Sequence, residues 1–307
     1  MRNVRTPLIL LALIVASVAG MVGLLRPELF SGGDAGGAGD VRTASAQPEE
    51  PDQGIPDPSG SGSTGPSSED GDTSDGPRLY LVLDDAGHDL DHLRAFMRFP
   101  GAFTVAVLPG LRYSADAVRM TIALGHEAIL HQPMEAVGGN DPGPGAIYVR
   151  QSDAEIRRTV TSNVASMPGI IGVNNHMGSR ATADQRVMGV VADALSRYRL
   201  FFLDSRTTAR SVAADATRSR GIDTAVRDVF LDNVREDDAI SAQLDEALAV
   251  ADEQGYAVMI GHVTSFELAR VLRDRYAEIT AAGYRFLPLS DLLERERARL
   301  SHAGSGY

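Results

Sequence analysis

Acidic and imidazole side chains repeatedly follow short apolar runs in this sequence. The run Ile170–Val173 is followed by Asn174-Asn175-His176, a concentration of hydrogen-bonding groups that is unusual directly after an apolar segment. Aspartate or histidine also follows five other apolar runs, as Asp84-Asp85, His131, Asp204, Asp232 and His262. Carboxylates and imidazoles bind divalent metals and exchange protons, so the pattern indicates a metal or acid–base site.

Short apolar runs alternate with longer amphipathic segments between Pro77 and Leu300. The runs are Leu79–Leu83, Phe103–Leu108, Ala128–Leu130, Ile170–Val173, Leu200–Leu203, Val226–Leu231, Ala257–Ile260 and Phe286–Leu289. Helix-like stretches between them include Tyr113–Leu124, Asp153–Ala165, Ala183–Tyr198, Ile240–Gln254 and Ser265–Ala282, with Ser152 and Ser265 as N-terminal caps. Alternating strands and helices indicate a parallel α/β sheet, and about eight strands in roughly 225 residues is typical of a barrel.

The carboxyl ends of parallel barrel strands meet on one face, where the active sites of such barrels lie. Asp84-Asp85 before Ala86-Gly87 is compatible with a simple turn, but a buried carboxylate pair requires a cation or a raised pKa. A single histidine at a strand end is usually structural, whereas His131, His176 and His262 at three strand ends favour a shared site. We assign no chemical role to four other histidines, which are His88, His92, His126 and His302.

One carboxylate and two imidazoles with open positions suit Zn²⁺ in a catalytic site. Such a metal lowers the pKa of a bound water towards about 7 and polarises a carbonyl oxygen. A second carboxylate is then available to accept the water proton, and a further histidine can protonate a leaving amine. The residue types therefore indicate hydrolysis of an amide or ester.

Composition narrows the choice of partner and ligand. The 307 residues are 43% hydrophobic and 23% charged, with a formal net charge of −12, which argues against a nucleic-acid partner. The chain has no cysteine, so disulfides and thiolate metal sites are excluded. Any metal must be bound by His, Asp or Glu.

The N-terminal quarter predicts export. Pro7–Leu25 is an uncharged apolar run preceded by Arg2 and Arg5, which indicates a membrane anchor with its N-terminus in the cytoplasm; a cleaved signal peptide is the alternative. Residues 31–76 carry ten acidic residues and one Arg (1 − 10 = −9), which predicts a disordered linker. We predict a signal-anchor at 1–30, a linker at 31–76, a barrel domain at 77–300 and a flexible tail at 301–307. The barrel domain is expected outside the cytoplasm, on the periplasmic or envelope side.

Residues Arg78–Leu293 resemble the divergent polysaccharide deacetylases, a branch of the polysaccharide deacetylase superfamily. The resemblance is carried by Leu83–Gly87, Ala106–Gly110, Gly125–Glu127 through His131–Met134, Val173–Arg180, Phe202–Thr208, Arg227–Asn233 and Ile260–His262. It implies a distorted (β/α) barrel of seven to eight mostly parallel strands. It also implies that Asp84 is the catalytic base, that Asp85 and His131 are metal ligands, and that His262 is the general acid.

This sequence departs from the superfamily pattern four residues after His131. The superfamily places its second metal histidine there, and this chain has Glu135. We expect His176 to supply the third ligand, with Asn174, Asn175 and Ser179 as candidates to orient the ligand histidines. Further site candidates are Asp204, to hold His262 or line the cleft, and Arg180 and Arg206, to orient Asp84, bind sugar hydroxyls, or pair with Asp204, Asp228 or Asp232.

The sequence thus predicts a Zn²⁺-dependent hydrolase, with another divalent metal as an option, that removes N-acetyl groups from an envelope or extracellular polysaccharide. Two alternatives stay open. One is a metal-independent glycoside hydrolase that uses Asp84 with Asp204 or Asp228. The other is a non-catalytic envelope protein that keeps the metal site for binding or stability.

Overall fold

The computed structural model describes residues 76–304. The predicted anchor and all but the last residue of the predicted linker lie outside this range. Within 76–304, no helix is long and apolar enough to cross a membrane. The last helix reaches Gly304, four residues into the segment predicted as a tail.

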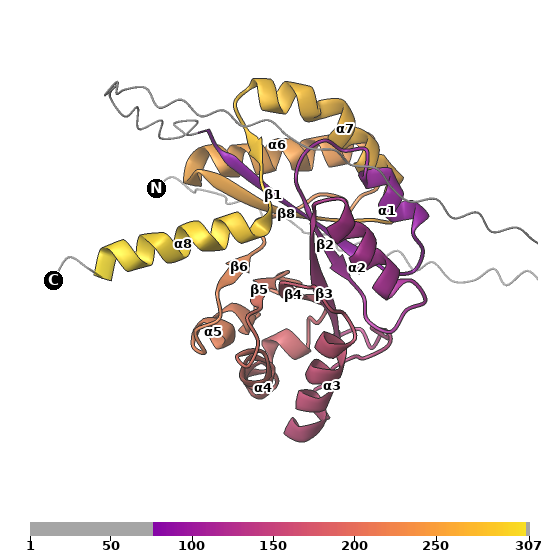
Figure 1. The fold of residues 1–307 in the computed structure, drawn as a ribbon, viewed down its shortest axis with the longest axis vertical. Helices are drawn as coiled ribbons and strands as arrows, with labels where there is room; N and C mark the ends of the chain where they lie inside the picture. The colour runs from indigo at the N-terminus through magenta and orange to yellow at the C-terminus, as the bar shows by residue number, and fades with distance from the viewer. Residues whose placement is uncertain (1–75, 305–307) are drawn as a thin grey trace, which may run out of the picture. The chain divides into compact units, whose positions relative to one another are not determined.

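A curved sheet of nine strands forms the centre of the described region, and every strand pairing in it is parallel (Figure 1). The strand order is β6-β5-β4-β3-β2-β1-β8-β7, with β9 paired to β1. The parallel α/β architecture predicted from the sequence is confirmed. The strands are β1 (Arg78–Ala86), β2 (Thr104–Val107), β3 (Glu127–Met134), β4 (Gly172–Met177), β5 (Phe201–Asp204), β6 (Thr224–Val226), β7 (Val229–Phe230), β8 (Tyr256–His262) and β9 (Arg285–Phe286).

The apolar run Val226–Leu231, predicted as one strand, is two strands at opposite ends of the sheet order. β6 pairs with β5, whereas β7 pairs with β8. Between them, the Asp228 carboxylate accepts a hydrogen bond from the Val258 backbone N–H at 2.8 Å, and the Asp228 N–H donates to the Val258 carbonyl at 2.9 Å. The Asp228 carboxylate therefore accepts a backbone hydrogen bond that a neighbouring strand would otherwise accept. Around this residue the chain leaves one edge of the sheet and joins the other.

Helices cover the outer face of the sheet (Figure 1). Ser152 begins α3 with a capping box, because its hydroxyl accepts from the Glu155 N–H while the Glu155 carboxylate accepts from the Ser152 N–H; Ser265 likewise accepts from the Leu268 N–H at the start of α7. The helices are α1 (Asp91–Phe96), α2 (Ser114–Ala123), α3 (Asp153–Ala165), α4 (Gln185–Leu195), α5 (Ala213–Arg218), α6 (Asp237–Gln254), α7 (Phe266–Ala281) and α8 (Leu289–Gly304), with a 3₁₀ turn at Ala181–Ala183.

Two apolar clusters lie on the two faces of the strands. Alternate residues of β1 belong to different clusters, because successive side chains of a strand point to opposite faces. Leu79 and Leu81 pack in the large cluster under the helices, whereas Tyr80 and Val82 pack in the smaller cluster on the inner face. Leu289, Leu292 and Leu293 of α8 join the inner cluster. The first turns of α8 therefore pack against the inner face of the sheet.

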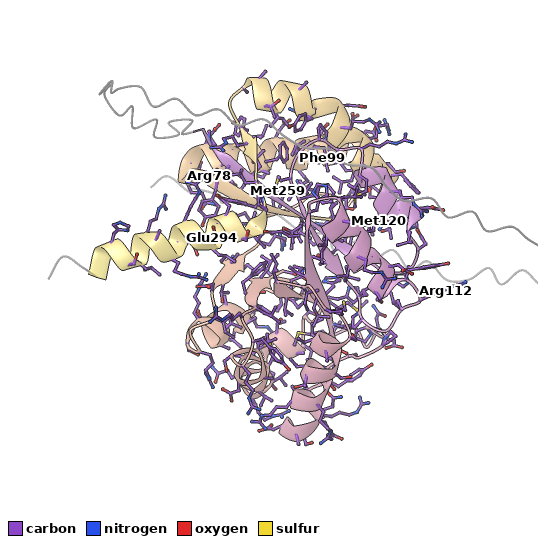
Figure 2. The ribbon with its side chains drawn as sticks, in the orientation of Figure 1. Arg78, Phe99, Arg112, Met120, Met259 and Glu294 are labelled. Atoms are coloured by element: carbon purple, nitrogen blue, oxygen red, sulfur yellow. The ribbon has the colours of Figure 1, made fainter. Side chains whose placement is uncertain are left out.

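Aromatic packing fixes α7 against the end of the sheet. Phe99, labelled in Figure 2, lies edge-on to Tyr276 of α7 and to Phe286 of β9, with ring centroids 5.3 and 5.0 Å apart. These contacts hold α7 beside β9, which pairs with β1.

Candidate metal and acid–base site

Polar side chains continue the inward-facing series of three strands. Asp84 follows Tyr80 and Val82 at period two on β1, and His262 follows the same pattern on β8. Asp84 is in register with His262. His131 of β3 is likewise in register with Asn174 of β4. The strand period and the register together place these four side chains at the carboxyl-end mouth of the barrel.

Asp85 joins the same group although it is adjacent to Asp84. In a regular strand the two side chains would point to opposite faces. The pairing of β1 with β2 shifts register between Leu83 and Ala86, and Asp85 has a φ of 67°, in the left-handed region. Backbone strain of this kind concentrates at functional sites. The irregularity allows both carboxylates to reach the mouth of the barrel.

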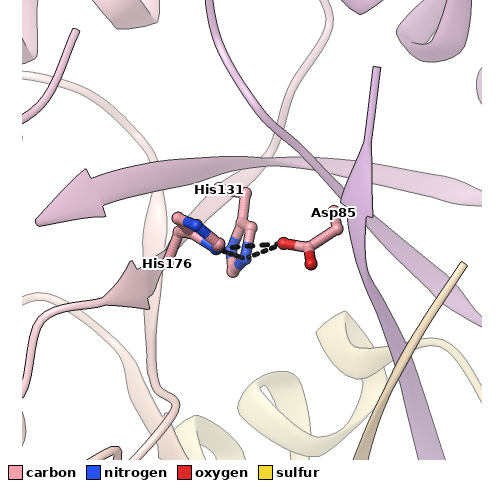
Figure 3. Close-up of side chains that lie close together, drawn as sticks. All are labelled: Asp85, His131 and His176. Atoms are coloured by element: carbon pink, nitrogen blue, oxygen red, sulfur yellow. Dashed lines mark hydrogen bonds and ion pairs between the residues drawn. The ribbon is translucent and has the colours of Figure 1, made fainter. Parts of the chain in front are cut away.

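Asp85, His131 and His176 form a compact triangle of potential ligand atoms (Figure 3). The Asp85 Oδ1 lies 3.2 Å from His131 Nε2 and 3.0 Å from His176 Nδ1, and the two nitrogens are 3.1 Å apart. A cation about 2.0–2.2 Å from each atom places the three atoms roughly 3–3.5 Å apart, depending on the angle at the metal. The buried Asp85 Oδ1 also has no hydrogen-bond partner of acceptable geometry. The three residues therefore fit a divalent metal.

The electrostatics of the triangle favour a positive charge at its centre. Burial opposes ionisation of Asp85, but the closeness of His131 and His176 outweighs it and holds the pKa of Asp85 far below its usual range. Burial likewise opposes protonation of His131, yet Asp84 and Asp85 raise its pKa above the usual value. Burial raises the pKa of Asp84 despite the opposing influence of His131. The positive charge at the centre of the triangle can therefore be supplied either by protons on the imidazoles or by a divalent cation.

His262 is paired with Asp232, which lies two residues after the end of β7. The Asp232 Oδ1 lies 3.0 Å from His262 Nδ1, and its Oδ2 accepts from the His262 backbone N–H at 3.0 Å. Burial by itself lowers the pKa of His262, but Asp232, together with Asp85 and Asp84, outweighs burial and raises the pKa above the usual value. The prediction that Asp204 holds His262 is wrong: Asp204 is buried and accepts from the Arg206 N–H and the Ser211 hydroxyl.

The two predicted arginines do not orient Asp84. Arg180 pairs with Glu135 at 3.0 Å, so the partner is none of the aspartates predicted for it. Glu135, the residue at the superfamily's second histidine position, is held by this pair and by the Val149 N–H at 2.6 Å. Arg206 is exposed and has a φ of 46°, with its backbone N–H bonded to Asp204.

The polar residues around His176 have different roles. Asn174 hydrogen bonds Asp84 at 2.9 Å and His131 at 2.7 Å, as expected for a group that orients a ligand histidine. Asn175 instead donates to the Met177 carbonyl and accepts from the Ser205 N–H. The Ser179 hydroxyl accepts from the Val137 N–H and makes no contact with the triangle.

A small hollow adjoins the triangle at His176. It has a volume of about 160 Å³ and is lined mainly by leucine and proline side chains, together with His88 and Asp141. The apolar residues are Leu108, Pro109, Leu111, Pro133, Pro142 and Pro144. The hollow can therefore receive a small, largely apolar group beside the metal-binding triangle.

Two contributors were not anticipated from the sequence in these roles. Asp232 was expected at a strand end with Arg180 or Arg206 as its candidate partner. It instead pairs with His262, because it follows the strand adjacent to that residue and parallel neighbours end at the same edge. Ser205, whose hydroxyl lies 3.3 Å from Asn174 Nδ2, follows β5 within the family motif Phe202–Thr208, but the sequence assigned it no role.

The chain belongs to the divergent polysaccharide deacetylase family, whose model matches residues 81–293. The family inferred from the sequence motifs is thereby confirmed. A protein of Haemophilus influenzae, named only as an uncharacterized protein, is 32% identical over 211 residues, which cover 69% of this chain and 72% of that protein.

Two further proteins are similar to this chain, one in sequence and one in structure. The uncharacterized protein YibQ of Escherichia coli is 33% identical over 185 residues, covering 60% of this chain and 58% of YibQ, so the match spans little more than half of YibQ. The crystal structure of the uncharacterized protein ATU2773 from Agrobacterium tumefaciens C58 superposes with a TM-score of 0.67 at 22% identity, covering 71% of this chain and 89% of that one. The latter likeness shows a shared fold.

Proposed function

We propose that this protein is a metal-dependent hydrolase that removes N-acetyl groups from an envelope or extracellular polysaccharide. The observation that supports the proposal is the triangle of Asp85, His131 and His176 with a second carboxylate and a paired histidine beside it. His262 Nε2 is 3.9 Å from Asp85 Oδ2, and Asp84 Oδ2 is 3.6 Å from His131 Nε2. All five side chains thus border one small volume.

Asp85, His131 and His176 would hold the cation, for which we propose Zn²⁺. A divalent cation bound there supplies Lewis-acid chemistry: it acidifies a water and polarises the acetyl carbonyl. Two imidazoles and one carboxylate with open positions are a ligand set that catalytic zinc takes, and the same set also accepts other divalent metals.

Asp84 accepts the proton of the attacking water in the proposed reaction. Its Oδ1 is occupied by the Asn174 amide, whereas its other oxygen borders the triangle. His262 donates a proton to the departing amine, and Asp232 favours the protonated imidazole and fixes its orientation. Each general acid or base of this kind contributes about 10²–10⁴-fold to the rate. The apolar hollow beside His176 suits the methyl end of an acetyl group.

Metal content of the purified full-length chain tests the proposal first. We expect about one zinc per chain in the parent and loss of that zinc in His176→Ala, since removing one of three ligands leaves only two. His126→Gln is the matched control, because His126 stacks on Phe103 away from the triangle. Acetate release from acetylated glycans is then measured with and without zinc. A chain that binds no zinc when the metal is supplied contradicts the proposal.

The two alternatives predict different results in the same assays. A carboxylate-only glycosidase keeps its activity in chelator and produces reducing sugar ends instead of acetate. Its candidate partners for Asp84 are both engaged elsewhere, Asp204 with Ser211 and Asp228 with Val258. A non-catalytic envelope protein binds the glycan and releases no acetate.

We also propose that the barrel acts outside the cytoplasm. The proposal rests on the apolar segment Pro7–Leu25 and on Arg2 and Arg5 before it. Fractionation of cells with protease treatment of intact spheroplasts tests it: digestion of the barrel from outside is expected, and full protection contradicts it.

A further inference from the structure

Asn174 lies between the candidate base and one candidate metal ligand. It is completely buried on β4. Its Nδ2 donates to Asp84 Oδ1 at 2.9 Å and to Ser205 Oγ at 3.3 Å, while its Oδ1 lies 2.7 Å from His131 Nδ1. The Asn174 amide thus contacts both the candidate base and a candidate metal ligand.

The orientation of this amide follows from its partners. The NH₂ end of Asn174 faces Asp84, whose Oδ1 accepts a hydrogen bond from it at 2.9 Å. The carbonyl end then faces His131, which must donate from Nδ1. A neutral imidazole with its proton on Nδ1 has its lone pair on Nε2. That is the nitrogen that lies 3.2 Å from Asp85 Oδ1 in the triangle.

We propose that Asn174 is a positioning residue that sets His131 to bind a metal through Nε2 and, by the same amide, holds the Asp84 carboxylate. The catalytic meaning of the second half rests on the proposed function, whereas the contacts themselves do not. Asn174 therefore links the orientation of the candidate ligand His131 to that of the candidate base Asp84. Different substitutions of Asn174 can remove one contact and keep the other.

The neighbouring asparagine shows that burial alone does not explain Asn174. Asn175 is equally buried, yet its amide bonds only backbone groups, at Met177 and Ser205. Asn175 therefore joins the ends of two strands. Asn174 differs in that two of its partners are titratable side chains of the site.

The acceptor end is tested by zinc affinity of the full-length protein, measured by competition with a chromogenic chelator. Asn174→Leu removes both ends and is expected to weaken zinc binding about 10–100-fold, the usual effect of losing the partner of a ligand histidine. Asn174→Asp keeps an acceptor for His131 Nδ1–H, so its affinity is expected to stay near the parental value. His126→Gln is the control, because His126 stacks on Phe103 away from the triangle, and it is expected to leave zinc binding unchanged. Parental affinity in Asn174→Leu, or equal loss in Asn174→Leu and Asn174→Asp, overturns the proposal.

The donor end is tested by thermal unfolding of metal-free protein. Asn174→Asp places two buried carboxylates in contact, which is expected to lower the Tm by roughly 5–10 °C. Asp84→Asn combined with Asn174→Asp restores one amide and one carboxylate with exchanged places, so the Tm is expected to recover. A double variant as unstable as the two single changes added together overturns this half.

Neither readout requires turnover. Zinc affinity and Tm that follow the expected pattern, in a protein that releases no acetate from any glycan, support the role of Asn174 and count against the proposed deacetylase. If Asn174→Leu does not fold, Asn174→Asp and the exchanged pair still decide the outcome.

Discussion

Gly261 lies between Ile260 and His262 on β8. Because those two side chains point to the inner face, a side chain at position 261 would point outward, towards α7. A Cβ built at this position lies 2.2 Å from Leu268 Cδ2, whereas ordinary contacts begin at about 3.4 Å. Gly261→Ala therefore requires a separation larger by about 1.2 Å (3.4 − 2.2). Leu268 is fully buried and its N–H is bonded to the Ser265 cap, so the first turn of α7 cannot yield freely.

We expect Gly261→Ala to destabilise the protein by about 1–3 kcal/mol, the usual cost of overpacking a core. For a domain of this size that corresponds to a Tm lower by about 2–12 °C. Because His262 is the next residue on the strand, the same displacement is expected to lower the proposed deacetylase activity in the protein that remains folded. Thermal and urea unfolding measure the first effect, and acetate release per folded molecule measures the second.

A second substitution separates steric crowding from other causes. Leu268→Ala alone is expected to cost about 2–5 kcal/mol through the cavity it creates. Adding Gly261→Ala to it should cost little more, because the added methyl group then occupies vacated space. Gly189→Ala in α4 is the control, since only Arg220 Nη2 at 3.9 Å lies near its Cβ; it is expected to stabilise by roughly 0.5–1 kcal/mol. Strictly additive losses at Gly261 and Leu268 would refute the argument.

Three further predictions concern other contacts. Asp232→Asn removes the carboxylate that raises the pKa of His262, so the alkaline limb of the pH–rate profile should move to lower pH and the rate near pH 8 should fall; an unmoved limb would show that His262 is not the acid. Ser152→Ala removes a capping-box hydroxyl and should lower stability by about 0.5–2 kcal/mol in urea unfolding, without changing zinc affinity. Burial lowers the pKa of His126, so below about pH 6.5 the unfolded chain binds a proton that the folded one resists, and stability should fall on acidification. In His126→Gln that part of the acid loss should disappear, and an unchanged pH dependence would contradict it.

The family and the fold class could be inferred from local patterns. Ser152 and Ser265 marked two helix starts because a cap requires only residues close in sequence. The parallel arrangement followed from the alternation of apolar runs and amphipathic stretches, since each run needs a helix to return the chain. These features depend on contacts within a few residues or within one strand–helix unit.

The division of Val226–Leu231 into two strands could not be inferred in the same way. An apolar run shows that a segment is buried but does not show which neighbour it pairs with. Here Asp228 bonds to Val258 on a strand 30 residues away, and that contact decides where β6 ends and β7 begins.

The sequence by itself determined which chemical groups are present and that they lie towards the carboxyl ends of strands. It placed Asp84, Asp85, His131, His176 and His262 at strand ends, because the period of a strand and the parallel sense of the sheet are local properties. The tertiary structure alone decided which of these groups touch. The partner of His262 is Asp232 and not Asp204, the partner of Asp84 is Asn174 and not an arginine, and the left-handed backbone at Asp85 turns two adjacent carboxylates into one site. Those outcomes depend on strand register and on a bulge, which are set by packing across the whole sheet and not by any single segment.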